Sequence, residues 1–324
     1  MEKIFKVILW ALIFACASNA GMGAKVAVMC ATDLHCCEPN YPWMKDRINE
    51  KSRSVDHVIF AINGDVVTKI IPDPNGVGWI VQPVGPGDSH SDRMQKFEDF
   101  LIEVLKNPKV EIVSNEGNHE FMHPEEVRRL LRKMRTLYPN RFYEITNVPV
   151  SGGFSGLIQP SVVLHGIRFI GYCTADIYTE RGNDAVHYMA ARKGGFYICK
   201  SGGKPANCPA HNARFQAALE SASTPVDVFM FHESRKQIVQ YIWPKVKKRD
   251  GTIIVAIIGH DHGDWRPNQE STRPYGIFNR QGKGVFIPES NNPGAPVDVF
   301  FPGADRVIIP KPFGQSIEVL DFQV

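Results

Sequence analysis

Residues 110–120 read Val-Glu-Ile-Val-Ser-Asn-Glu-Gly-Asn-His-Glu, an apolar segment followed directly by a polar one. The stretch from Val110 to Val113 has the length and composition of a buried strand. Gly117-Asn118-His119-Glu120 then closes the segment with an amide, an imidazole and a carboxylate. Because four specified residues in a row seldom arise by chance in a chain of this size, the segment indicates a strand that ends in chemically active side chains.

Four other apolar segments end in the same way, in aspartate or histidine. Continuous apolar strands are covered on both faces, which predicts an α/β fold with helices on each side of a sheet. Because ligands bind at the carboxyl ends of strands in such folds, we expect all five polar clusters to meet there. The four segments are Lys25 to Asp33 with His35, Val58 to Ile62 with Gly64-Asp65, Val226 to Phe231 with His232, and Ile253 to Ile258 with Gly259-His260-Asp261-His262.

The residue types in these clusters favour a metal centre. Residues i and i+2 of a strand point the same way, so Asp33 and His35 converge on one ion if the strand persists that far, as do His260 and His262. Each of the other four clusters is a weak signal alone, because a lone histidine such as His232 is more often a hydrogen-bonded structural residue. The donors are imidazole, carboxylate and amide oxygen without thiolate, which suits zinc, manganese, iron or cobalt.

In this order, the five clusters resemble those of the calcineurin-like metallophosphoesterase superfamily, and most closely the catalytic domain of exported 5′-nucleotidases. Gly117 to Phe121, Asn147-Val148 and Gly166 to Thr174 resemble that branch, and the resemblance covers about residues 26–263. It implies an α/β fold with a two-sheet β-sandwich flanked by helices. It also implies two divalent metal ions at the carboxyl ends of the strands.

The resemblance further implies a role for each residue of the clusters. His119 would face the substrate as the catalytic residue, stabilising charge or protonating the leaving oxygen, the alternative being a purely structural role. The seven implied metal ligands are Asp33, His35 and His262 on one ion, Asn118, His232 and His260 on the other, and Asp65 bridging the two.

The sequence departs from the family pattern at three places. Many relatives carry an aspartate where this chain has Thr68, and the nucleotidase block continues with an aspartate where this chain has Met122. Both carboxylates orient the catalytic histidine in relatives, so the partner of His119 stays open, with Asp88 as one candidate. The chain also ends soon after His262, so we expect the base-stacking second domain of the nucleotidases to be absent.

Residues 1–20 have the pattern of a cleaved signal peptide. Two lysines precede an apolar run from Val7 to Ala17, which is too short to span a membrane, and small residues follow at Ser18-Asn19-Ala20. The alternatives are an uncleaved anchor or a lipid-modified Cys16. We therefore expect residues 21–324 to form a single metallophosphoesterase catalytic domain that is exported, periplasmic or secreted, without stable membrane insertion.

Seven cysteines occur in the chain, and export would permit disulfides. Cys199 and Cys208 lie in a loop rich in glycine and proline, so we predict a disulfide between them. The adjacent Cys36 and Cys37 are expected to stay unbonded to each other.

The remaining pattern adds helices, a hairpin and further histidines. Helices are expected at Met94 to Lys106, Pro124 to Leu137, Ala213 to Ala222 and Ser234 to Lys247, a hairpin around His165-Gly166, and short strands near 284–287, 297–301 and 316–320. The histidines outside the clusters are interpreted as ordinary surface or hydrogen-bonded residues: His57, His90, His123, His165, His187 and His211.

The composition limits the function. Of 324 residues, 43% are apolar and 22% charged, with a formal net charge of +3, which gives no sign of a nucleic-acid polymer as partner. The first hypothesis is a metal-dependent hydrolase of small phosphomonoesters, including nucleoside 5′-monophosphates. The alternatives are a phosphodiesterase acting on cyclic nucleotides or lipid head groups, and a non-catalytic metal-binding protein.

Overall fold

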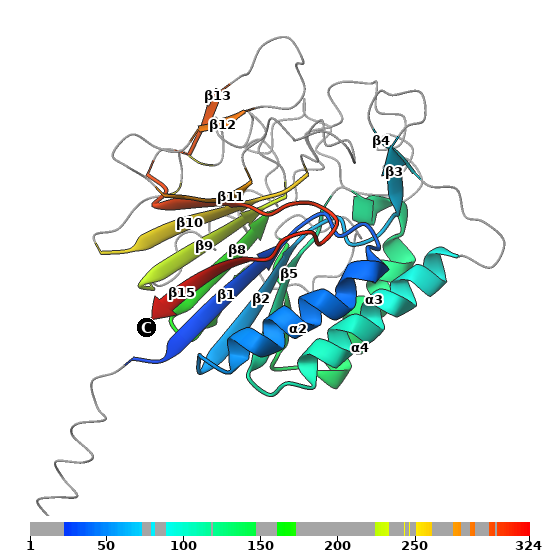
Figure 1. Cartoon of the computed structure of the whole chain (residues 1–324), viewed down its shortest axis with the longest axis horizontal. Coiled ribbons are helices and arrows are strands. Elements are labelled where there is room, and N and C mark those ends of the chain that lie inside the picture. Colours follow the sequence, from blue (N-terminus) through cyan, green and yellow to red (C-terminus); the bar gives the residue numbers. More distant parts are fainter. Residues whose placement is uncertain are drawn as a thin grey trace, which may run out of the picture.

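The computed structural model describes residues 23–72, 79–81, 89–117, 119–146, 161–172, 224–232, 243, 246, 251–260, 275–279, 286–288, 298–301 and 303–324. Within these ranges two mixed β-sheets lie face to face and helices cover an outer face (Figure 1). The predicted signal peptide, the predicted Cys199–Cys208 disulfide, the helix expected at 213–222 and most of the helix expected at 234–247 lie outside the described residues.

The first sheet has five strands in the order β15-β1-β2-β5-β6. Strands β1, β2, β5 and β6 run parallel to one another, and the edge strand β15 is antiparallel to its neighbour β1. The parallel strands therefore present their carboxyl ends at the same end of the sheet. Their bounds are β1 Lys25–Ala31, β2 His57–Asn63, β5 Val110–Asn115, β6 Phe142–Glu144 and β15 Glu318–Gln323.

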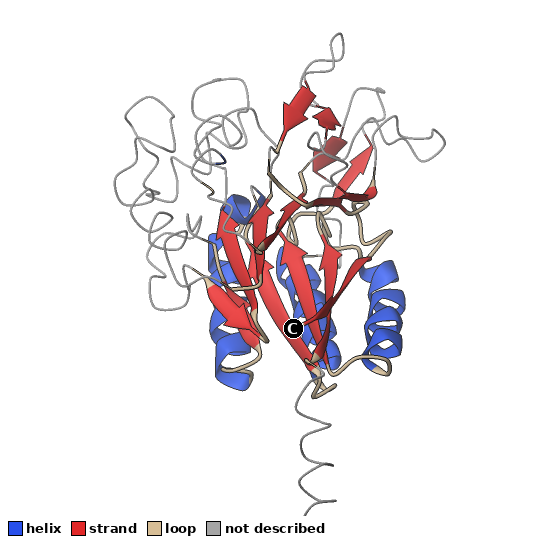
Figure 2. Ribbon diagram, turned by 90° about the vertical axis from the view of Figure 1, so that its left-hand side faces the viewer, coloured by secondary structure: helices blue, strands red, loops and turns tan. Residues whose placement is uncertain are grey.

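The second sheet has six strands in the order β11-β14-β10-β9-β8-β7. Strands β8, β9, β10 and β14 run parallel, and both edge strands are antiparallel. Figure 2 shows the arrowheads of the parallel strands of both sheets directed toward the same end of the molecule. The bounds are β7 Val162–Leu164, β8 Ile167–Tyr172, β9 Val226–Phe231, β10 Ile253–Ile258, β11 Gly276–Asn279 and β14 Arg306–Ile309.

Two short ribbons lie outside these sheets. Strand β3 (Ile70–Pro72) pairs with β4 (Trp79–Val81), and β12 (Phe286–Pro288) pairs with β13 (Asp298–Phe300), each in the antiparallel sense. Figure 1 shows β3 and β4 beyond the carboxyl ends of the parallel strands of the first sheet, and β12 and β13 above the second sheet. The ribbon of β3 and β4 therefore lies at the end of the molecule that carries the polar clusters.

Apolar side chains between the sheets form the central core. Alternate residues of each strand point inward, for example Val28, Ile59 and Val113 from the first sheet and Val228 and Ile257 from the second, and all five are fully buried. The opposite residues of the first sheet, such as Phe60 and Ile112, pack against the helices. Both faces of these strands are thus covered, which explains their uninterrupted apolar sequence.

Three helices cover the outer face of the first sheet (Figure 1): α2 (Tyr41–Ser52), α3 (His90–Leu105) and α4 (Pro124–Leu137). The sequence analysis missed α2, because only a narrow stripe of Tyr41, Met44 and Ile48 is buried in an otherwise polar segment. Helix α3 begins four residues before the expected Met94, because the Ser89 side chain accepts a hydrogen bond from the Asp92 backbone and caps it. Helix α4 has the expected bounds.

The two-sheet α/β architecture that the family resemblance implied is confirmed. The expectation from the apolar pattern alone, helices on each side of a sheet, is wrong for the first sheet, because its other face packs against the second sheet. The described cysteines Cys30, Cys36 and Cys37 are free, which agrees with the expectation that Cys36 and Cys37 do not pair. Among the described residues, no helix has both the length and the apolar character needed to cross a membrane.

Candidate metal centre

Loops from both sheets meet at the carboxyl ends of the parallel strands. Strands β1, β2 and β5 of the first sheet lead into Asp33, Asp65 and His119, and β9 and β10 of the second lead into His232 and His260. The meeting of five strand ends, expected from the sequence, therefore occurs among residues that are far apart in the chain.

Asp33 and His35 reach the site from a loop. Strand β1 ends at Ala31, so the strand alternation on which their convergence was predicted does not apply and that part of the prediction is wrong. Asp33 and His35 have positive φ angles of 51° and 44°. Their backbone N–H groups donate to the carbonyls of Gly64 and Asp65 at 3.1 and 2.8 Å, so the loop after β1 is tied to the loop after β2.

Left-handed backbone recurs around the site. Asp65, Thr68 and His260 have φ angles of 52°, 67° and 69°, in addition to Asp33 and His35. Non-glycine residues adopt this conformation at a cost of about 1 kcal/mol or more each, and such residues cluster at functional sites. The strand ends thus hold strained turns that direct polar side chains toward one point.

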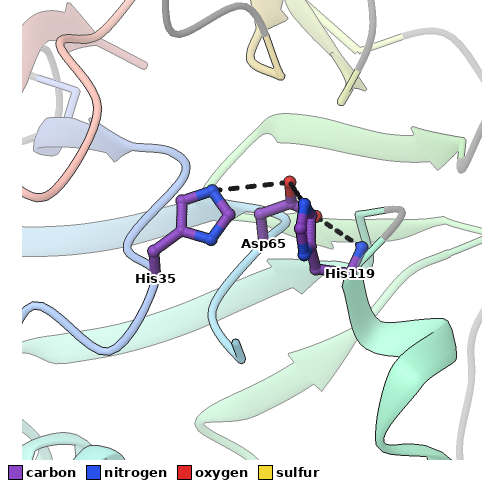
Figure 3. A group of neighbouring side chains, drawn as sticks. All are labelled: His35, Asp65 and His119. Atoms are coloured by element: carbon purple, nitrogen blue, oxygen red, sulfur yellow. Dashed lines mark hydrogen bonds and ion pairs between the residues drawn. The ribbon is translucent and has the colours of Figure 1, made fainter. Parts of the chain in front are cut away.

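The polar side chains at the strand ends are directed toward the buried carboxylate of Asp65 (Figure 3). Its Oδ2 atom lies 3.0 Å from His232 Nε2, 3.7 Å from His35 Nε2 and 3.8 Å from His119 Nε2. Its Oδ1 atom accepts a hydrogen bond of 2.8 Å from the backbone N–H of His119. Three imidazole nitrogens therefore surround a single carboxylate oxygen, while the other oxygen fixes the start of the 3₁₀ helix at His119–Met122.

Backbone carbonyls orient two of these imidazoles. His35 Nδ1 lies 2.9 Å from the carbonyl oxygen of Thr68, and His232 Nδ1 lies 2.8 Å from that of Asn63. A histidine that donates its Nδ1–H to a carbonyl presents a lone pair on Nε2, which is the usual arrangement of metal-ligating histidines. Thr68, flagged in the sequence as a missing aspartate, thus contributes through its backbone, a role that its side-chain identity does not reveal.

Asp33 links the two sheets on the other side of His232. Its Oδ1 atom lies 3.9 Å from His232 Nε2. Its Oδ2 atom accepts hydrogen bonds from the Thr32 hydroxyl at 2.6 Å and from the backbone N–H of His260 at 2.9 Å. These contacts hold one carboxylate oxygen in place and direct the other toward the imidazole that Asp65 also contacts.

Glu120 holds the loop that carries Asp65. Its buried carboxylate accepts backbone hydrogen bonds from Asp65 at 2.9 Å, Val66 at 2.8 Å and Val67 at 3.2 Å. The sequence motif contained Glu120 but gave it no role. A carboxylate that receives several N–H groups of one turn fixes the direction of that turn.

An asparagine pair joins the two sheets beneath the site. Asn63 and Asn115 are register partners at the ends of β2 and β5. Asn63 donates to the carbonyl of Phe231 at 2.9 Å, and Asn115 donates to Asn63 Oδ1 at 2.9 Å and to the carbonyl of Met230 at 3.2 Å. The sequence analysis missed this contact, although two amides at the ends of apolar strands were a visible signal.

Glycines allow the strand ends to approach closely. A Cβ atom on Gly64, whose φ is +81°, would lie 2.4 Å from His232 Nδ1, and one on Gly117 would lie 2.4 Å from Asp65 Oδ1. A Cβ atom on Gly259 would lie 2.0 Å from Thr32 Oγ1. Each glycine of the expected clusters therefore occupies a position without space for a side chain.

The charges of the site favour a cation at its centre. Burial would raise the pKa of Asp65, but the surrounding imidazoles, with His232 first, hold it well below its usual range. Burial would lower the pKa of His232, but the carboxylates of Asp65 and Asp33 raise it to about 10. The carboxylates and the imidazoles thus stabilise each other's charged forms in a buried place, and the buried negative charge of Asp65 and Asp33 favours a cation beside them.

The described residues fit a divalent metal. Asp65 Oδ2 is buried and accepts no well-aligned hydrogen bond from the described residues, although three imidazole nitrogens lie near it. Two groups of ligand atoms share this residue, one formed with His35 and His119 and the other with His232 and His260. A carboxylate common to two groups is what a bridging ligand requires.

The predicted site residues divide into two sets. The structure brings together Asp33, His35, Asp65, His119, His232 and His260. Asn118, His262 and the candidate partner Asp88 lie outside the described residues. His119 belongs to the same group of potential metal ligands as His35 and Asp65, although it was predicted to face the substrate. Its side chain is 15% exposed.

Comparison with known proteins identifies the family of the chain. A family model described as calcineurin-like phosphoesterase matches residues 26–264. No curated protein matches the chain. One solved structure covers 93% of this chain and 95% of its own chain at 13% identity, with a TM-score of 0.47. Another, GAP50, the anchor in the inner membrane complex of Plasmodium, covers 90% of this chain and 73% of its own at 11% identity, with a TM-score of 0.38.

Proposed function

Because this chain belongs to the calcineurin-like phosphoesterase family, whose members are metal-dependent hydrolases, we propose that it hydrolyses small phosphomonoesters, including nucleoside 5′-monophosphates. The observation that supports this most is the convergence of His35, His119 and His232 on one oxygen of Asp65. Such a group of imidazoles around a shared carboxylate is suited to holding two divalent ions.

The proposed ligands among the described residues are Asp33, His35, Asp65, His232 and His260, with Asn118 and His262 completing the set outside them. Two bound divalent ions would lower the pKa of a water molecule and neutralise charge on phosphoryl oxygens. The carbonyls of Thr68 and Asn63 keep His35 and His232 in the orientation that ligation needs.

His119 is proposed to handle a proton. It is the most exposed of the three imidazoles around Asp65, at 15% against at most 1% for His35 and His232. Its backbone is fixed by the bond to Asp65 Oδ1, so its ring is held at the edge of the centre. From that place it can donate a proton to the leaving oxygen of an ester.

The position of Phe313 favours substrates whose leaving group has an apolar face. Its partly buried ring lies beside His35, with ring centroids 5.7 Å apart, and its backbone N–H donates to the carbonyl of Asp33 at 2.8 Å. A nucleoside could pack against such a ring. Phe313→Ala should then raise KM for AMP and leave KM for glycerol 3-phosphate unchanged, and an equal change for both would remove this support.

The proposed activity is tested with two chromogenic esters, p-nitrophenyl phosphate and bis(p-nitrophenyl) phosphate. Protein reconstituted with manganese or zinc should hydrolyse the monoester faster than the diester, and a chelator should abolish turnover. Asp65→Asn should lose activity, whereas Asp321→Asn, which alters an exposed partner of Lys51, should keep it. Faster diester hydrolysis would favour a phosphodiesterase, and no turnover by metal-loaded protein would favour a non-catalytic metal-binding protein.

Export is part of the proposal. Its support is the apolar run within residues 1–20 and the small residues that end it. N-terminal sequencing of secreted or periplasmic protein should find a chain that begins after Ala20. Protein that keeps its first residues and two free thiols at Cys199 and Cys208 would contradict it.

A further inference from the structure

A second group of potential metal ligands lies away from Asp65. His57, Glu111 and His165 each offer one ligand atom, and these atoms lie within 4.8 Å of one another. His165 Nε2 contacts Glu111 Oε2 directly, and the rings of His57 and His165 stack with centroids 3.5 Å apart at an angle of 18°. From the sequence, both histidines were interpreted as ordinary surface or hydrogen-bonded residues, because they lie outside the polar clusters.

The topology explains why the three residues meet. His57 is the first residue of β2, and Glu111 is the second residue of β5. Glu111 pairs with Ile59, two residues after His57, so His57 and Glu111 lie on the same face of the first sheet, the face that meets the second sheet. His165 lies in the turn between β7 and β8 of the second sheet, with a φ of 48°.

This cluster lies at the opposite end of the strands from the candidate metal centre. Asp65 follows the last residue of β2, whereas His57 begins that strand, and a strand of seven residues spans roughly 20 Å. The two clusters therefore share no residue and cannot hold the same ion.

The chemistry of the cluster is that of a borderline metal site. Two imidazoles and one carboxylate form a donor set that suits Zn²⁺ and its neighbours among divalent transition ions. All three residues are partly buried, with side chains of Glu111 and His165 exposed by 13% and 25%, so water can supply the remaining positions. The contact of His165 with Glu111 already places the imidazole nitrogen beside the carboxylate.

We propose that His57, Glu111 and His165 bind one divalent transition ion of the zinc type, independently of the centre at Asp65. The ligands come from both sheets, so the ion would fasten the β7–β8 turn to the amino ends of β2 and β5. Its effect is structural: it should stabilise the folded chain without taking part in ester hydrolysis.

Zn²⁺ binding by equilibrium dialysis with elemental analysis tests this proposal. Asp65→Asn, which weakens the central site, should still bind one Zn²⁺ per chain. Adding His165→Gln or Glu111→Gln should lower the affinity for that ion by about tenfold or more, as loss of even a supporting partner of a metal ligand often does. The control Glu50→Gln, which removes an exposed carboxylate paired with Arg47, should leave the affinity unchanged.

Thermal unfolding supplies a second readout that does not depend on activity. Zn²⁺ should raise the midpoint of Asp65→Asn and have no such effect when His165→Gln is added. Equal Zn²⁺ affinity with and without His165→Gln would show that the three residues form only an ion pair and a ring stack. The thermal midpoints of the metal-free variants show whether each variant still folds. If His165→Gln does not fold, Glu111→Gln tests the proposal in its place.

Discussion

Asp65 receives the contacts of three loops. His232 and His35 approach its Oδ2 atom, the backbone of His119 binds its Oδ1 atom, and Glu120 holds its own backbone N–H. His35, His232 and the adjacent pair His119 and Glu120 come from three different parts of the chain. The position of a single carboxylate thus depends on the ends of β1, β2, β5 and β9 together.

His119 gives a prediction at the scale of one residue. His119→Ala should keep the central metals and lower kcat by about 10²–10⁴-fold, which is the usual loss when a general acid is removed. Elemental analysis and steady-state kinetics on the same preparation measure both quantities. A variant that loses metal together with activity would place His119 among the ligands, beside His35 and Asp65, and one with unchanged kcat would assign the proton to another group.

The end of β10 has no room for an additional side chain. Gly259 follows β10 by one residue, and a Cβ atom there would lie 2.0 Å from Thr32 Oγ1 and 2.8 Å from Asp33 Oδ2. The backbone N–H of the next residue, His260, donates to that same carboxylate oxygen. A displacement of β10 therefore moves both Asp33 and His260.

Gly259→Ala should consequently reduce metal affinity and destabilise the fold by roughly 1–3 kcal/mol, the usual cost of overpacking. Thr32→Ala removes the nearer contact, so the double variant should recover part of the stability. Denaturant unfolding of the single and double variants measures the difference. Gly259→Ala with native stability and metal affinity would mean that this strand end tolerates a side chain.

Strand β6 carries a buried carboxylate whose proton affects stability. Burial raises the pKa of Glu144 from 4.5 to about 7, with the charge of Glu120 adding to the shift and hydrogen bonds from Thr146 opposing it. Between these two pH values the folded chain holds a proton that the unfolded chain has lost. The free energy of unfolding should therefore fall as the pH rises through this range, by up to about 3 kcal/mol.

Glu144→Gln should reduce the slope of that part of the pH profile, because glutamine does not titrate, while Glu120, whose pKa burial also raises to about 7, keeps its own contribution. Unfolding in denaturant at several pH values between 4.5 and 7 compares the variant with the native chain. Glu50→Gln, at an exposed position, is the control and should keep the native slope. Equal slopes for the native chain and Glu144→Gln would show that this carboxylate ionises normally.

For the whole molecule, the features that could be predicted from the sequence are those that short-range patterns of apolar and polar residues encode. The apolar runs of β1, β2, β5, β9 and β10 and the polar residues that end them were readable, because both faces of these strands are buried. Helix α2 was not, since its buried stripe is narrow.

Contacts between residues that are distant in the chain could not be predicted from the sequence. The turns that bring Asp33 and His35 to the site depend on hydrogen bonds to the loop after β2, and no local pattern encodes them. The same holds for the backbone hydrogen bonds that Glu120 accepts and for the meeting of His57 with Glu111 and His165. The first two sets of contacts form when β1, β2 and β5 pair in the first sheet, and the third forms when the second sheet packs against it.

The central claim is that Asp65 joins two metal ions at the strand ends. Anomalous diffraction from crystals of the native chain grown with Mn²⁺ tests it most directly, because the signal locates each ion. Two peaks are expected about 3.5–4 Å apart on either side of the Asp65 carboxylate, one near His35 and the other near His232. An Asp65 carboxylate that contacts no ion, or only one, in crystals saturated with Mn²⁺ would contradict it.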